Sequence, residues 1–195
     1  YGETWQSIVG TGEQAIPKDD FVRVIRADPG QAGVLYAGTE TGLYVSLDDG
    51  ASWRRWHSNL PVTPIYDLQV KGSDLVIATH GRSFWILDDL TPLHQIAQSE
   101  TGNSPTLFMP RASWRLLPDI FDILTTSDGK DYSVGLGKAA TYVASRDENG
   151  LIERKFLDAG ESAAQCVIVY YHLSEAIAAD AVASLRILDG AGNTV

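Results

Sequence analysis

An internal repeat constrains the fold of this 195-residue chain more than any other feature. Residues 77–86 repeat residues 36–45 at an offset of 41 positions. Each copy has an apolar strand with alanine near its end, a polar turn containing glycine, and a strand with adjacent aromatic and aliphatic residues. A further strand-like segment precedes each copy, at residues 21–27 and 65–70. A period of about 40–50 residues with several strands in each unit is typical of a β-propeller blade.

Short strands dominate the predicted secondary structure. Nearly every apolar segment is brief, rich in β-branched or aromatic residues, and bounded by Gly, Pro, Asn or Asp. The second blade is expected from residue 65 to about residue 90, and the strands of the first lie near residues 21–27, 34–38, 43–46 and 52–56. A propeller closes with about four to eight blades, so we expect a piece of a longer polypeptide, with other blades before Tyr1.

The character of the chain changes after residue 93. Residues 1–93 are expected to form the final propeller blades, and the polar residues 94–105 predict a linker. Residues 106–195 carry regularly spaced strand-like runs, which favour a β-sandwich module of the immunoglobulin or fibronectin type. These runs are residues 106–109, 113–117, 140–144, 151–157, 166–173 and 182–188. The predicted fold class is therefore all-β.

Three further segments carry local predictions. Residues 125–133 predict a mobile loop. The alanine-rich residues 174–183 are the best helix candidate, with a loop leading into the next strand as the alternative. Residues 189–193 predict a tight turn, and a return strand is expected to begin at residue 194.

Composition narrows the classes of function. The chain has 25 acidic and 15 basic residues and a net charge of −10, which argues against non-specific nucleic-acid binding because that needs Lys and Arg to neutralise phosphates. The single cysteine, Cys166, excludes an internal disulfide and a cysteine-based zinc site. It lies in an apolar run, so we expect a buried structural thiol. No apolar run approaches the roughly 18 residues of a membrane-spanning helix.

The sharpest motif is the eight-residue stretch 46–53, which fits Ser-x-Asp-x-Gly-x-(Ser/Thr)-Trp, the Asp box. Its chemistry is that of a rigid hairpin. Ser46 opens the motif, and Asp48 is expected to accept backbone N–H bonds from the turn. Gly50 supplies a positive φ without a Cβ clash, and Trp53 buries its ring beneath the turn. Residues 2–5 resemble the tail of another copy, and residues 87–90 a degenerate third.

These motifs resemble the Asp-box propellers, which include sialidases, xyloglucanase-type glycoside hydrolases, sortilin-type receptors and photosystem-assembly-factor-like proteins. Residues 34–39 and 78–90 look like the last blades of bacterial proteins described as glycosyl hydrolases with BNR repeats. Those proteins carry a small β-sandwich after the propeller, to which residues 107–111, 170–173 and 185–192 are similar. The resemblance omits residues 118–154 and implies a fold more than an activity, because the Asp box is structural in all these families.

Analogy with the fold places the candidate site residues. In a four-stranded blade, the turns between the second and third strands lie on the ligand-side face, together with the connections between blades. The Asp box lies on the opposite face. The ligand-side candidates are Glu40, His80 and Arg82, with Asp19, Asp20 and Asp67 as lesser ones.

Each candidate also has a structural alternative. Glu40, His80 and Asp67 are the candidates for catalysis, His80 as a general base, although no nucleophile is evident beside it. Glu40 could equally be a solvated turn residue. His80 and Arg82 could stabilise the final turn by hydrogen bonds, and Asp67 could pair with a neighbouring backbone group. The tryptophans are interpreted as core or edge packing rather than as sugar-stacking platforms.

Specific activities can be compared with these residues. A sialidase needs three arginines around the substrate carboxylate, and only Arg82 lies in a suitable turn, so that activity fails on this segment. A xyloglucanase-type hydrolase needs two carboxylates across a cleft, which blades outside this segment would supply. Zinc, phosphate-loop and EF-hand motifs are missing from the sequence, so we expect no metal and no cofactor.

The leading functional prediction is non-catalytic ligand recognition or a scaffold role, within a parent resembling BNR-repeat propellers. The alternative is the C-terminal part of a glycoside hydrolase, with its catalytic carboxylates mostly in other blades. The expected partners are the rest of the propeller and a carbohydrate or peptide ligand, without nucleic acid or a membrane span. The sequence leaves the compartment open, although the resemblance favours a secreted or cell-envelope protein.

Overall fold

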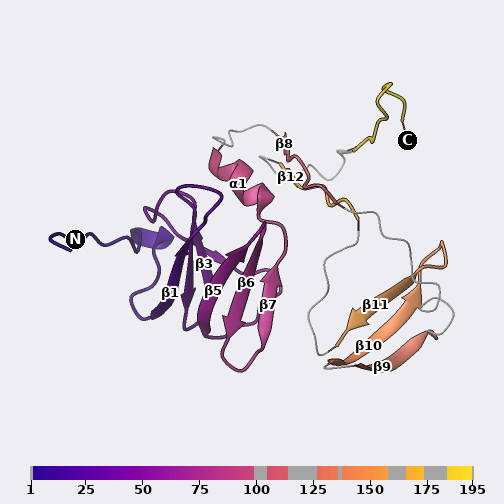
Figure 1. Cartoon of the computed structure of the whole chain (residues 1–195), viewed down its shortest axis with the longest axis horizontal. Helices are drawn as coiled ribbons and strands as arrows, with labels where there is room; N and C mark the ends of the chain where they lie inside the picture. Colours follow the sequence, from indigo (N-terminus) through magenta and orange to yellow (C-terminus); the bar gives the residue numbers. More distant parts are fainter. Residues whose placement is uncertain are drawn as a thin grey trace.

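Antiparallel β-sheets are the main regular structure of the protein (Figure 1). The structure, a computed structural model, describes residues 2–98, 105–113, 127–135, 138–157, 166–173 and 184–194. The described strands form four separate sheets, and none of these sheets is closed. A short 3₁₀ turn, η1 (Gly12–Gln14), precedes the first of them.

The first sheet has four strands that follow one another in sequence order. They are β1 (Val22–Ala27), β2 (Leu35–Thr39), β3 (Leu43–Ser46) and β4 (Arg54–Trp56). The second sheet repeats this order with three strands, β5 (Ile65–Lys71), β6 (Asp74–Thr79) and β7 (Phe84–Leu87). The strand positions predicted from the repeat are therefore confirmed.

The two sheets pack face to face around the main core. Its buried side chains come from both sheets: Val24, Val34, Tyr36, Leu43, Val45, Ile65, Leu68, Val70, Leu75 and Ile77, with Leu90 and Leu93 beyond β7. Gly38 sits where the backbones come closest. A Cβ on Gly38 would lie 2.5 Å from Cγ2 of Ile65 and 2.7 Å from Cγ1 of Val24, so only glycine fits this spacing between the sheets.

The opposite face of the first sheet is covered by the N-terminal segment. Ile16 and Trp53 pack there with Ala37 and Tyr44 in a second buried cluster. The Trp53 indole donates a hydrogen bond to the carbonyl of Ile8 at 2.6 Å. Trp5, in contrast, is exposed, which corrects its predicted role in packing.

In the part of the chain that the structure describes, no segment covers the corresponding outer face of the second sheet at β7. Phe84 and Ile86 on β7 are 75% and 57% exposed. The second sheet thus buries one face, whereas the first buries both.

A helix replaces part of the predicted linker. The helix α1 (Thr91–Gln98) follows the second sheet, so residues 94–98 are helical rather than an irregular connection. Asp89 begins this turn, since its Oδ1 accepts hydrogen bonds from the Thr91 backbone N–H at 3.1 Å and hydroxyl at 2.6 Å. Leu93 is buried against the core, and that contact explains why a polar sequence is helical here.

A buried carboxylate joins α1 to the first sheet. Asp28, in the turn between β1 and β2, accepts hydrogen bonds from the Tyr36 hydroxyl at 2.7 Å and the Gly30 N–H at 2.7 Å. His94 Nε2 of α1 lies 2.8 Å from its Oδ2. Burial raises the pKa of Asp28, but the hydrogen bonds from Tyr36, His94 and Gly30 outweigh that effect, so the pKa lies below its ordinary value. A charged Asp28 therefore ties the helix to the sheet.

The segment after α1 also contacts the second sheet. The backbone N–H and C=O of Met109 bond to the Gln95 side chain at 2.8 and 2.9 Å. Arg111 Nη1 donates to Asp74 Oδ1 at 2.8 Å. Phe108, directly before Met109, is buried, so residues 108–111 lie fixed against α1 and β6.

The rest of the chain contains two further sheets. One is three-stranded, in the order β11 (Ile152–Phe156), β10 (Lys138–Arg146) and β9 (Gly129–Gly135). The other pairs β8 (Thr106–Leu107) with β12 (Tyr171–His172). Both are antiparallel, which agrees with the all-β prediction.

Several local predictions here have a definite outcome. Residues 129–133 lie in β9 instead of a mobile loop, because their backbone pairs with β10. Cys166 is exposed, which corrects its expected burial: its apolar run is not incorporated into a covered sheet. The turn at residues 189–193 is confirmed by a bridge between Leu188 and Thr194. Residues 174–183 and most of 113–117 lie outside the described residues.

Candidate functional site

The Asp box is a structural turn, as its sequence predicts. The Ser46 hydroxyl lies 2.8 Å from Asp48 Oδ1 and accepts the Gly50 N–H at 2.8 Å. Asp48 accepts the Ser52 N–H at 2.8 Å, and Gly50 has a φ of 89°. Trp53 is buried beneath the turn. These groups bond to one another, so they have little capacity left for a ligand.

The candidate ligand-side residues gather at the other end of the first two sheets. The turn between β2 and β3 carries Glu40, and the turn between β6 and β7 carries His80. Figure 1 shows the β6–β7 turn at the end of the sheets opposite α1. We call this region the Glu40–His80 end. It is joined across the two sheets, because β1 contacts β5.

Two β-bulges place side chains at this end. The pairing of β1 with β2 shifts register between Val22 and Val24, and that of β5 with β6 shifts between Ile65 and Asp67. Arg23 and Tyr66 occupy the two irregularities. A bulge turns its residue out of the regular alternation of a strand. Both side chains are exposed, and the Arg23 guanidinium carbon lies 4.6 Å from the centroid of the Tyr66 ring.

Four side chains form a continuous ladder across the two sheets. Glu40 makes an ion pair with Arg23, Arg23 lies over Tyr66, and Tyr66 stacks on His80. The Tyr66 and His80 ring centroids are 4.9 Å apart and their planes differ by 4°. The hydrogen bond to Glu40 raises the pKa of Arg23, so the guanidinium stays charged at any physiological pH. We call Glu40, Arg23, Tyr66 and His80 the ladder.

Asp67 lies beside the ladder in a second pair between the sheets. Its Oδ1 is 2.6 Å from Nη2 of Arg26 and accepts the Leu68 backbone N–H at 2.8 Å. Arg26 also donates through Nε to the carbonyl of Leu68 at 3.0 Å. Asp67 thus has the structural pairing that was its alternative in the sequence, made through its Oδ1, while its side chain is 60% exposed.

The remaining candidates have different positions. Asp20 is buried and holds the β2–β3 turn, accepting bonds from the Thr39 hydroxyl at 3.0 Å and the Thr41 hydroxyl at 2.7 Å. Asp19 is exposed. Arg82 is exposed in the turn that carries His80, and its guanidinium has no ion-pair partner among the described residues. The carbonyl of Arg82 accepts a bond from the Trp85 indole at 2.8 Å.

Two exposed apolar residues lie at the same end of the sheets as the ladder. Phe21 is 71% exposed, and its carbonyl accepts the Glu40 N–H at 3.0 Å. Val62 is 73% exposed in the connection that bonds to the His80 turn, where the Pro64 carbonyl accepts the His80 N–H at 2.9 Å. These bonds hold Phe21 and Val62 at the Glu40–His80 end.

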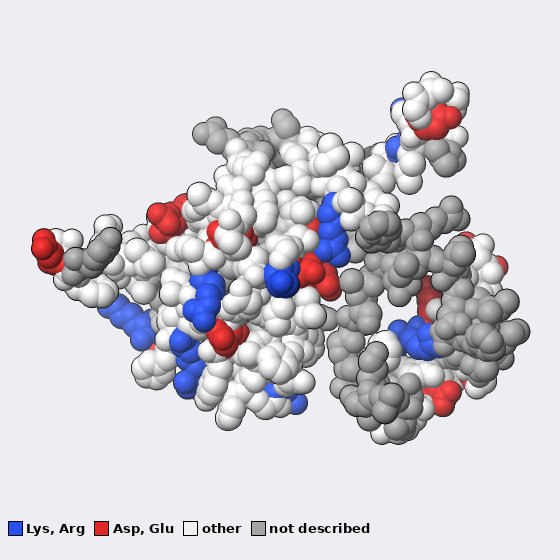
Figure 2. Space-filling model, in the orientation of Figure 1, with Lys and Arg blue, Asp and Glu red and all other residues white. Residues whose placement is uncertain are grey.

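The charge on the sheets is mixed. Figure 2 shows Lys and Arg side chains interspersed with Asp and Glu over the visible face of the sheets. A ligand at the Glu40–His80 end therefore meets neighbouring positive and negative side chains, and not an electrostatic potential of a single sign.

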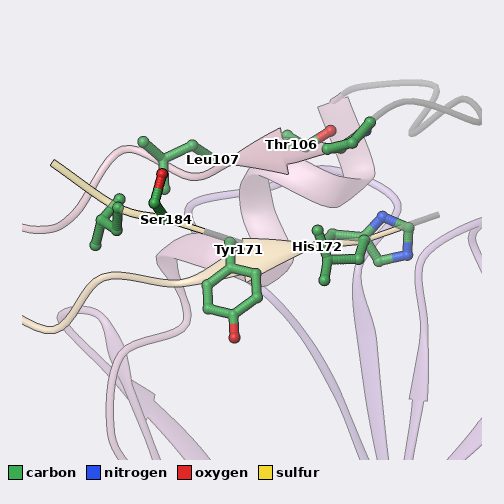
Figure 3. Close-up of a pocket in the computed structure, with 8 residues that line it drawn as sticks. Thr106, Leu107, Tyr171, His172 and Ser184 are labelled. Carbon is green, nitrogen blue, oxygen red and sulfur yellow. The ribbon is translucent and has the colours of Figure 1, made fainter. Parts of the chain in front are cut away.

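Apart from the ladder, a hollow lies at the two-stranded sheet. It has a volume of about 350 Å³, and its lining comes from β8, β12 and the segment at residues 184–185 (Figure 3). Leu107, Tyr171 and Leu185 are all more than half exposed, so the hollow is open and mostly apolar. Its lining includes no ion pair between described residues, and its polar groups do not converge as they do at the ladder.

The described residues contain no group of three or more His, Cys, Asp or Glu side chains suited to a metal ion. No helix among them is long and apolar enough to cross a membrane. The chain matches no protein-family model, no curated protein and no solved structure. What the site does must therefore be argued from its geometry.

The sequence identified two of the four ladder residues. Glu40 and His80 were expected at the same end of the sheets, and they lie there. Arg23 and Tyr66 connect them, and neither of these two was predicted from the sequence. In β1 and β5, the sequence around Arg23 and Tyr66 shows only exposed residues next to buried ones. That pattern does not reveal a bulge.

Proposed function

We propose that residues 1–93 are the final two blades of an Asp-box propeller, that a β-sandwich module follows at residues 106–195, and that this segment recognises a ligand without carrying out chemistry. Two consecutive antiparallel sheets of like order, packed face to face, support the propeller. The Asp box in the outer turn of the first sheet supports it further. The ladder is the observation that carries the recognition function.

The ladder is better suited to binding than to stabilising the fold. Its ion pair is more than a third exposed, and such pairs contribute about 0–1 kcal/mol to stability. Tyr66 is 48% exposed, so the burial of its ring offsets little of the conformational entropy that is lost when the ring is held in one position. Rigid aromatic and arginine side chains on a surface are typical of interfaces, because they lose little freedom when a ligand covers them.

Catalysis has less support at this end. Glycoside hydrolysis requires two carboxyl groups facing the scissile bond, one as acid and one as base or nucleophile. Three of the four candidate carboxylates here are already bonded within the chain, Glu40 to Arg23, Asp67 to Arg26, and Asp20 to the turn that it holds, and only Asp19 is exposed without such a bond among the described residues. His80 has Tyr66 against one face, and among the described residues no hydroxyl is bonded to its imidazole ring; the Thr63 hydroxyl donates to the His80 backbone carbonyl instead, at 3.3 Å.

The test is a binding screen of the chain against arrayed glycans and a display library of random short peptides, followed by variants of the ladder. We expect Tyr66→Ala to weaken any enriched ligand by about tenfold or more, because it removes the centre of the ladder. Tyr132→Ala on β9 is the matched control, since Tyr132 is also an exposed tyrosine on a strand. Equal binding by Tyr66→Ala and the wild type would contradict this function.

A further inference from the structure

The ladder has one end that is closed and one that is open. Glu40 closes the first end, because its charge is neutralised by Arg23. At the other end, Tyr66 covers one face of the His80 ring, and His80 is still exposed. Among the described residues no second ring stacks on His80. The exposed surface of His80 is therefore the outer face of its ring, which is nearly parallel to the Tyr66 ring on the other side, together with the ring edge.

A flat group from a ligand fits this outer face. Stacked rings prefer centroid distances of about 4.5–7 Å, and the Tyr66–His80 pair is already in that range. The ring of His80 is held in place from below, so a ligand ring would not have to order it. Phe21 and Val62 are exposed at the same end, so further apolar groups of a ligand would find apolar surface there.

The polar groups near the ladder separate two ring-bearing ligand classes. A sugar offers a flat C–H face but also hydroxyl groups, and its recognition needs nearby side chains with free hydrogen-bonding capacity. The carboxylates of Glu40, Asp67 and Asp20 are already bonded within the chain. These bonds reduce the capacity of the three carboxylates for sugar hydroxyls, and the exposed apolar Phe21 and Val62 at the same end favour an aromatic side chain.

Arg82 adds a charge requirement to the ligand. It lies two residues from His80 in the same turn, it is exposed, and no described carboxylate pairs with it. An acidic group near the ligand ring would complement it. The net charge of −10 opposes an acidic ligand only at long range, because a Debye length of about 8 Å at physiological salt leaves the local contact largely unaffected.

We propose that the Glu40–His80 end binds a peptide segment of a partner protein, with an aromatic side chain stacked on the outer face of His80 and a neighbouring carboxylate paired with Arg82. This inference rests on the proposed recognition function and names its ligand. The ladder then has five members in the complex, the last supplied by the partner.

The experiment selects random short peptides on the full chain and measures the enriched peptides by calorimetry against five variants. We expect Trp, Tyr or Phe in the enriched peptides, with Asp or Glu within a few positions. His80→Ala should weaken binding about tenfold or more, whereas His80→Phe, which keeps a flat ring, should stay within about threefold. His57→Ala, at an exposed histidine beyond β4, should have no effect.

The arginine arm tests the charge. Arg82→Ala should weaken binding about threefold to tenfold and reduce its salt dependence, because a rim charge acts mainly through screened attraction. Arg54→Ala on β4, an exposed arginine outside the Glu40–His80 end, is the control. Thermal melts of all variants establish that they are folded.

The outcomes distinguish the two proposals. Enriched peptides without an aromatic residue, or aromatic peptides that bind His80→Ala as tightly as the wild type, would overturn this inference. A glycan that binds in a Tyr66-dependent manner would also overturn it, while leaving recognition at the ladder intact. If neither library yields a ligand that depends on Tyr66, both proposals fail.

Discussion

Arg23 and Tyr66 occupy matching bulges in β1 and β5, and the guanidinium of one lies 4.6 Å from the ring centroid of the other. A bulge leaves one residue without a paired residue on the neighbouring strand, and it changes the direction of that residue's side chain. Two successive sheets with a bulge at the same level therefore bring their irregular residues together. Each turn then adds one more member, Glu40 from the first sheet and His80 from the second.

The first prediction concerns the cost of breaking this contact. Arg23→Ala should leave the urea midpoint of unfolding close to that of the wild type, because both the ion pair and the cation–π contact are exposed. Urea unfolding of the two proteins measures the difference. A clearly lower midpoint in Arg23→Ala would mean that the ladder holds the sheets together, and its proposed role in recognition would weaken.

The second prediction concerns the close approach at Gly38. Gly38→Ala should destabilise the protein by about 1–3 kcal/mol, because the added methyl group would overlap Ile65 and Val24 at the interface of the two sheets. Chemical denaturation provides the measurement. Gly190→Ala is the control, since a Cβ there meets nothing within 4 Å. Equal stability of Gly38→Ala and the wild type would show that the sheets can move apart freely.

The third prediction concerns pH and the carboxylate that ties α1 to the first sheet. The folded pKa of Asp28 lies below its unfolded value, so its contribution to stability is complete above an unfolded pKa of about 4 and is lost as pH falls through the folded value. Asp28→Asn should cost about 2–4 kcal/mol at pH 7 and should flatten the acid limb of the stability curve.

Urea unfolding between about pH 2 and pH 7 checks this prediction. Asp19→Asn serves as the control, because Asp19 is an exposed carboxylate and should leave the curve unchanged. An unaltered acid limb in Asp28→Asn would mean that other carboxylates, such as Asp48 with its own lowered pKa, dominate acid unfolding.

The strands of the first two sheets could be predicted because their signals are local. Alternating apolar residues, Gly-containing turns and the Asp box each act within about ten residues, and β1 begins only one residue from its predicted start. The ends of the strands gave the positions of Glu40 and His80 in the same way. Asp48 and Gly50 carry out their predicted roles because an Asx turn and a positive φ are also local properties.

The rest depends on contacts between distant residues. A bulge belongs to the pairing of two strands, so neither Arg23 nor Tyr66 could be assigned to the site from its own neighbourhood. The helix α1 has only eight residues and depends on the burial of Leu93 and the contact from His94 to Asp28, which lies 66 positions away. Asp20 looked like a ligand-side carboxylate, but the fold uses it inside a turn.

The last prediction concerns the uncovered face of the second sheet. Phe84 and Ile86 stand exposed on β7, which is an edge strand of an open three-stranded sheet. An apolar edge strand of this kind promotes association. We expect the isolated chain to associate as its concentration rises, and we expect the double variant Phe84→Ser with Ile86→Thr to stay monomeric over the same range. Light scattering after gel filtration measures both. Val167→Ser, at another exposed apolar residue, should associate like the wild type. A wild-type chain that stays monomeric and melts cooperatively would contradict the expectation, because the exposed apolar face of the second sheet would then be stable in water without a partner.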